Sequence, residues 1–197
     1  MQHMRWRKKT AQDVHPISMV VHHNMHAVIS RYEPSRIIDV GGNGKLDRFF
    51  DCEVINANLC HGIDGADLPF EDDSFDVAAS IATLEHVGDT ERQVQFVREC
   101  CRVATKANVH WFPAGECAAG IERLKEELGH PHPCILPDRA LEQIQREFKS
   151  ASVSPFVSCS EHLLLLATIN KRMNINRVYD FVHRHGNEHY GVILEIR

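Results

Sequence analysis

The segment FDVAASI, residues 75–81, carries apolar or small side chains on both faces of the strand that it would form. A strand of this kind is buried on both sides, which is typical of a central strand in a parallel sheet. Two shorter apolar segments, RIIDV (36–40) and EVINA (53–57), precede it and have the composition of further strands. The chain is therefore expected to build a sheet whose two faces are covered by helices.

Helical patterns alternate with these strands along the chain. Pro16 suits the first turn of a helix that runs to about Tyr32. Thr90 and Gln93 have the spacing of a capping box at the start of another helix. Further strands are predicted at 108–112, 151–157 and 190–196, and further helices at 45–50, 117–128, 138–148, 161–169 and 175–185. Strands alternating with helices predict an α/β protein with a mostly parallel sheet.

Composition limits the class of protein. A chain of 197 residues is long enough for one sizeable core. Its formal net charge of −5 argues against strong non-specific binding of nucleic acid, so nucleic acid is an unlikely partner despite the basic residues 5–9. The seven cysteines form no CxxC pair, which favours a reduced, cytoplasmic protein. We expect neither a membrane span nor a signal peptide.

The glycine-rich segment IIDVGGNGKL, residues 37–46, follows the first strand at the end where an α/β sheet binds ligands. Its glycines do not match the spacing of a dinucleotide fingerprint, and it is not a phosphate loop of the GxxxxGK[ST] type. Asp39 would also repel a phosphate held against the backbone, whereas it would attract a cationic ligand. S-adenosylmethionine carries a sulfonium and an ammonium. The alternative is an ordinary turn with a solvated aspartate.

The segment DGADLPFEDDSFDVAASIATLEHV, residues 64–87, resembles the corresponding segment of class I methyltransferases, and within them the methyltransferase type 11 subgroup. The resemblance extends from Ile37 to the C-terminus and is weaker after Gly115. It implies a seven-stranded, mostly parallel, Rossmann-like sheet with helices on both faces and an antiparallel last strand. It also implies S-adenosyl-L-methionine as the cofactor.

The resemblance implies which residues would hold this cofactor. The acid and glycines of the first loop would cradle its amino-acid end, and residues 64–66 would meet its adenine. The backbone at the end of the third strand would accept its ammonium. The implied set is Asp39, Gly41, Gly42, Asn43, Gly44, Asn58, Asp64, Gly65, Ala66, Ser80 and Ile81.

Two departures from the family pattern stand out. The glycine loop is one residue short, with Lys45 where a third spaced glycine is expected. In addition, the second strand ends in Asn58, or alternatively Asn56, where the family has an acid that binds the ribose hydroxyls. A neutral hydrogen bond is about half as strong as a charge-assisted one. A catalytically silent binding or regulatory protein is therefore the alternative to an enzyme.

His86, in the sequence LEHV, is the candidate catalytic base, because a histidine titrates near neutral pH. It could instead pack against the cofactor, and its neighbour Glu85 is expected to be structural. No (Asp/Asn)-Pro-Pro-(Tyr/Phe) motif is present, which argues against methylation of DNA bases or glutamine. The histidines lack partners at zinc-ligand spacing, so we expect no metal. The Pro-rich loop 129–137 is either a substrate lid or a simple connector.

The sequence thus predicts one methyltransferase domain over residues 1–197. Residues 1–33 form an N-terminal arm and helix, 34–115 the cofactor-binding half, and 116–197 the substrate-side half. The predicted activity is methyl transfer to a small molecule, a glycan or a lipid precursor. The atom methylated and the oligomeric state are left open by the sequence.

Overall fold

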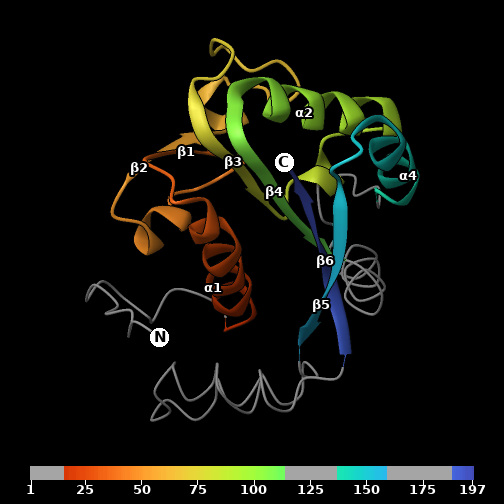
Figure 1. The fold of residues 1–197 in the computed structure, drawn as a ribbon, viewed down its shortest axis with the longest axis horizontal. Helices are drawn as coiled ribbons and strands as arrows, with labels where there is room; N and C mark the ends of the chain where they lie inside the picture. The colour runs from red at the N-terminus through yellow and green to blue at the C-terminus, as the bar shows by residue number, and fades with distance from the viewer. Residues whose placement is uncertain (1–15, 114–136, 159–187) are drawn as a thin grey trace.

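The computed structural model describes residues 16–113, 137–158 and 188–197, which form an α/β fold (Figure 1). The strands are β1 (Arg36–Val40), β2 (Glu53–Ala57), β3 (Phe75–Ile81), β4 (Ala104–Pro113), β5 (Ser152–Ser158) and β6 (Glu188–Ile196). The α-helices are α1 (Pro16–Ile29), α2 (Thr90–Val103) and α4 (Asp138–Glu147). Of the predicted elements, helices 117–128, 161–169 and 175–185 and the loop 129–137 lie outside the described residues or nearly so.

The six strands form one sheet in the order β2-β1-β3-β4-β6-β5. Strands β1 to β4 are parallel, and β6 runs antiparallel to both β4 and β5. The mostly parallel sheet with an antiparallel last strand is therefore confirmed. The chain runs from β1 to β2 on one side and returns to place β3 on the other side of β1. This reversal of strand order puts the expected ligand crevice at the carboxyl ends of β1 and β3.

The described residues hold six strands where the family resemblance implies seven. Between β2 and β3 they contain the 3-10 helix η3 (Leu59–His61) and an isolated bridge between Asp64 and Asp67. Residues 61–73, HGIDGADLPFEDD, are rich in Gly, Asp and Pro, which disfavour a strand. No strand is therefore added beyond β2 in this segment.

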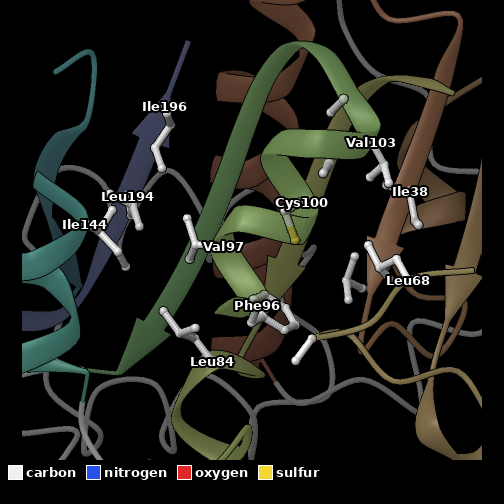
Figure 2. Close-up of a cluster of buried hydrophobic side chains, with 14 of the residues drawn as sticks. Ile38, Leu68, Leu84, Phe96, Val97, Cys100, Val103, Ile144, Leu194 and Ile196 are labelled. Atoms are coloured by element: carbon white, nitrogen blue, oxygen red, sulfur yellow. The ribbon is translucent and has the colours of Figure 1, made fainter. Parts of the chain in front are cut away.

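Helices cover both faces of the sheet. Helix α1 packs on one face with the buried Met25 and Ile29, while α2 and α4 pack on the other. A cluster of buried apolar side chains fills each of these two interfaces. Figure 2 shows Phe96, Val97 and Cys100 projecting from α2 into the cluster beneath α2 and α4, which also includes Ile144 of α4. Strand β3 is buried on both faces between the two clusters, as its sequence predicted.

One local prediction was met in part and one was wrong. Residues 45–50 are helical only as the short 3-10 helix η2 (Leu46–Phe49), which follows the glycine turn. Helix α2 is capped by Asp89, whose Oδ1 accepts a hydrogen bond from the Arg92 amide at 2.9 Å. Thr90 is the first helical residue, and the Gln93 side chain donates to the Leu84 carbonyl at 3.2 Å instead of closing a capping box.

Candidate functional site

A cavity of about 480 Å³ opens at the carboxyl ends of β1, β2 and β3. Its size is in the range of small-molecule sites, and it lies at the reversal of strand order. Five of the residues predicted from the sequence line it: Gly41, Asn58, Asp64, Gly65 and His86. The other lining residues are Val40, Ala57, Leu59, Cys60, Ile63, Ala82, Thr83, Val87, Arg92 and Phe96.

The glycine turn after β1 closely approaches the loop after β3. Gly41 has a φ of +81°, and a Cβ atom added there would lie 2.3 Å from Oγ1 of Thr83. Only glycine combines this backbone conformation with such a close approach. Its amide donates to the Ala57 carbonyl at 2.6 Å, so the turn is also tied to the end of β2.

Two asparagines, Asn56 in β2 and Asn58 just after it, form hydrogen bonds to the glycine turn. Asn58 Nδ2 donates to the carbonyls of Gly41 and Gly42 at 3.1 and 3.0 Å. Asn56 Oδ1 accepts from the Gly44 amide at 2.9 Å, while its Nδ2 donates to Asp47. Both asparagines considered for the ribose position thus bind the protein itself. Gly42, Gly44 and the exposed Asn43 belong to the turn but lie outside the cavity lining.

Asp39 lies beneath the glycine turn, one residue before the cavity lining begins. Its side chain packs against Gly42, where an added Cβ would lie 2.1 Å from Oδ2 of Asp39. The residue is 3% exposed, and its Oδ1 has no hydrogen-bond partner in the described part of the chain. Burial, with a smaller contribution from the Asp47 carboxylate, raises the pKa of Asp39 to about 7. A buried carboxyl of this kind favours a nearby cation.

The segment after η3 forms another wall of the cavity. Asp64 lines it, accepts a hydrogen bond from the Ala66 amide at 2.9 Å, and forms an ion pair with Arg92 of α2. Gly65 packs against the ring of Phe96, because an added Cβ would lie 2.4 Å from that ring. Ala66 is buried in the core behind the wall.

The end of β3 contributes differently from the prediction. Ser80 is fully buried and its Oγ is 2.9 Å from Nδ1 of the equally buried His110, whose pKa is lowered to about 4 by burial. Neither Ser80 nor Ile81 is among the cavity-lining residues, whereas the following Ala82 and Thr83 are. Ala82 has a φ of 53°, an uncommon conformation for a residue with a Cβ.

His86 lies in the 3-10 helix η4 (Leu84–His86) and lines the cavity. Its Nε2 is 3.9 Å from Oε1 of Glu85, and its amide donates to the Thr83 carbonyl at 2.8 Å. Glu85 is buried, which raises its pKa to about 7. The pair joins a half-exposed imidazole to a buried carboxyl at the cavity edge.

Several lining residues were not singled out by sequence reasoning. Arg92 and Phe96 come from α2, a helix whose start was predicted at Thr90 but to which no ligand role was assigned. Thr83 could have been found, since it follows the strand that empties into the crevice. Within the described residues, no group of three His, Cys, Asp or Glu side chains could hold a metal ion, and no helix there is long and apolar enough to cross a membrane.

The family model described as "Methyltransferase domain" matches residues 43–111, which run from the glycine turn into β4. The comparison with curated proteins found no match.

Three solved structures illustrate the similarity of fold. A protein of Pyrococcus horikoshii has a TM-score of 0.57 at 12% identity, covering 98% of this chain and 94% of that one. A SAM-dependent methyltransferase of Thermotoga maritima has a TM-score of 0.53 at 14% identity, with 89% and 88% covered. Geranyl diphosphate C-methyltransferase of Streptomyces coelicolor, in complex with S-adenosyl-L-homocysteine, has a TM-score of 0.51 at 12% identity, with 88% and 75% covered.

These findings confirm the resemblance carried by residues 64–87. The chain has the fold of the class I S-adenosylmethionine-dependent methyltransferases, and its residues 43–111 match the methyltransferase-domain family.

Proposed function

We propose that this protein binds S-adenosyl-L-methionine in the cavity at the ends of β1, β2 and β3 and transfers a methyl group to a small molecule, a glycan or a lipid precursor. The observation that carries the proposal is the position of the cavity. It lies where the strand order reverses, and its walls come largely from the segment that matches the methyltransferase family.

The chemistry of the cavity suits this cofactor. Asp39, buried and without a partner for Oδ1 in the described residues, favours a cation above it. In the proposed arrangement the turn of Gly41, Gly42, Asn43 and Gly44 adjoins the amino-acid end. The end of β3 at Ser80 and Ile81 adjoins the ammonium through Ala82, the next residue and the first there to line the cavity. Asp64, Gly65 and Ala66 adjoin the adenine, with the Phe96 ring behind them. When bound, the cofactor supplies an electrophilic methyl group on a sulfonium.

His86 is the candidate base for this reaction. It lines the cavity, and Glu85 beside it would stabilise its protonated form. In the proposed role His86 takes the proton that a hydroxyl or amine acceptor loses as its oxygen or nitrogen is methylated. Carbon acceptors are equally compatible with the proposal. One fold can serve enzymes with different substrates, and the Streptomyces enzyme of similar fold is a C-methyltransferase of geranyl diphosphate.

The proposal also covers the cellular location of the protein and the parts of the chain that bind the cofactor and the methyl acceptor. Four cysteines in the described residues are unpaired, namely Cys52, Cys60, Cys100 and Cys101, which supports a reducing, cytoplasmic location. We assign residues 34–115 to the cofactor and residues 116–197 to the acceptor.

The second candidate is a catalytically silent protein that uses the same cavity for binding alone. The engagement of Asn58 with the glycine turn favours it, because the side chain expected to face the ribose is already bound to the protein.

Calorimetric titration of the full chain with S-adenosylmethionine and S-adenosylhomocysteine tests the binding. We expect measurable affinity for both, weakened by about tenfold in Asp39→Asn through loss of the buried charge. A cation beside Asp39 would ionise its carboxyl, so binding near pH 7 should release a fraction of a proton. Titrations in buffers of different ionisation enthalpy measure that proton, and Asp39→Asn should not release it. No affinity at millimolar concentration would refute the proposal.

The enzyme is separated from the silent protein by turnover. The chain and S-adenosylmethionine are incubated with a small-molecule fraction of cell extract, and S-adenosylhomocysteine is quantified. An enzyme forms it in excess over protein, with a rate that falls in His86→Gln. Tight binding with no product in any fraction would favour the silent protein.

A further inference from the structure

The side chain at the end of β2 donates hydrogen bonds into the protein, where a ribose-binding acid would accept them from a ligand. We propose that Asn58 is a positioning residue that fixes the glycine turn, and that the ligand is held without the charge-assisted ribose bond that an acid at the end of β2 would make. The identity of the ligand in this inference rests on the proposed function. The positioning role rests on the hydrogen bonds of Asn58.

The direction of the hydrogen bonds distinguishes Asn from Asp at this position. Asn58 Nδ2 carries two hydrogens and lies 3.1 Å from the Gly41 carbonyl and 3.0 Å from the Gly42 carbonyl. A carboxylate is an acceptor only and would face two carbonyl oxygens with no hydrogen between them. The amide is therefore required by this conformation of the turn.

The amide oxygen is also engaged by the protein. Asn58 Oδ1 accepts from the Cys60 amide at 3.1 Å and so caps the 3-10 helix η3. The backbone carbonyl of Asn58 accepts from the amides of His61 and Ile63 at 2.9 and 3.2 Å. One residue thus ties the turn after β1 to the loop after β2, and both segments line the cavity.

The arrangement also compensates for the short glycine loop. The turn is followed by the four-residue 3-10 helix η2 rather than an α-helix, so little regular structure fixes its downstream end. Asn58 holds its carbonyls and Asn56 holds the Gly44 amide. Loss of the Asn58 side chain should therefore disorder the turn. A carboxylate at this position should repel the carbonyl oxygens of Gly41 and Gly42.

The test compares Asn58→Asp and Asn58→Ala with the natural chain, using Gln145→Glu as a control. Gln145 is exposed on α4, so this variant makes the same amide-to-carboxylate change away from the cavity. We expect both Asn58 variants to lower Tm, by about 4–8 °C for the loss of two hydrogen bonds. The deficit of Asn58→Asp should be larger at pH 8 than at pH 4.5, because a protonated carboxyl can still donate to one carbonyl. The control should show neither effect.

Ligand binding supplies an independent measurement. We expect Asn58→Asp to bind S-adenosylhomocysteine at least about fivefold more weakly than the natural chain. The natural chain should bind the 3′-deoxy analogue within about threefold of S-adenosylhomocysteine, whereas loss of a charge-assisted bond costs tenfold or more. Tighter binding by Asn58→Asp with an unchanged Tm, or a loss above tenfold for the analogue, would overturn the inference. A natural chain that binds neither compound would refute the proposed function, while the Tm measurements would still decide the role of Asn58.

Discussion

Replacing Asp39 by asparagine should make the stability of the ligand-free protein less dependent on pH. Burial raises the pKa of Asp39 from 3.8 to about 7. Between these values the folded state holds a proton that the unfolded state has released, so unfolding releases that proton. The contribution of Asp39 to stability therefore falls as the pH rises through this interval and is lowest above pH 7.

The magnitude follows from the same two values. Each pKa unit corresponds to about 1.4 kcal/mol, so the ionised carboxylate lowers the free energy of unfolding by roughly 4 kcal/mol well above pH 7. Between pH 5 and pH 8 the change is about 2–3 kcal/mol. The asparagine side chain of the variant has the same shape but no charge, and its own cost of burial does not depend on pH. Glu85, whose pKa is also raised to about 7, contributes equally to both proteins and cancels in the difference.

Urea unfolding of both proteins at several pH values measures the effect. The gain in stability of Asp39→Asn over the natural chain should grow by about 2–3 kcal/mol from pH 5 to pH 8. Asp67→Asn, at an exposed aspartate in the neighbouring loop, controls for the change in net charge. A difference between Asp39→Asn and the natural chain that stays constant over this range would refute the reasoning. A constant difference would mean that Asp39 is ionised in the folded protein at pH 5 as well as at pH 8.

Three further substitutions have expected results that differ in kind. Arg92→Gln removes a partly exposed ion pair, so the free energy of unfolding should change by less than about 1 kcal/mol. Calorimetry should show severalfold tighter binding of S-adenosylhomocysteine, because Asp64 no longer has Arg92 as its partner. Gly41→Ala should lower the free energy of unfolding by about 2–4 kcal/mol, because the new methyl group meets Thr83 and the residue has a positive φ. A decrease below about 0.5 kcal/mol in urea unfolding would contradict the close approach of the two loops. Ile144→Ala removes a fully buried side chain between α4 and the sheet and should cost about 2–5 kcal/mol, whereas the exposed control Glu142→Ala should cost little.

Much of the fold could be predicted because its main signals are local. The strands at 36–40, 53–57 and 75–81 lie at the predicted residues, since short apolar segments bounded by turn residues are strong strand signals. The helix start at Asp138 was found for the same kind of reason, because an apolar stripe follows it. The number of strands could not be read in this way. It was inferred from the family, and the segment after β2, with its glycines and aspartates, forms an isolated bridge in place of a further strand.

The candidate site was predictable in position and less so in detail. The position of the crevice follows from topology, and the resemblance to the family then indicated that Gly41, Asp64 and His86 belong to it. The partners of Asn58 could not be predicted, because they depend on how the glycine turn folds back over the end of β2. A side-chain amide offers both donors and an acceptor, so its identity alone does not reveal which group it uses.

The hydrogen bonds of the glycine turn explain why a cation suits this cavity better than a phosphate. A phosphate loop leaves its backbone amides free to point at the ligand. Here the amides of Gly41 and Gly42 donate to the carbonyls of Ala57 and Asp39, and that of Gly44 donates to Asn56. These three amides are therefore already used, and the buried carboxyl of Asp39 lies beneath them. The turn thus offers none of these three amides to a phosphate, and Asp39, which a nearby cation would ionise, is consistent with a ligand that carries a sulfonium and an ammonium.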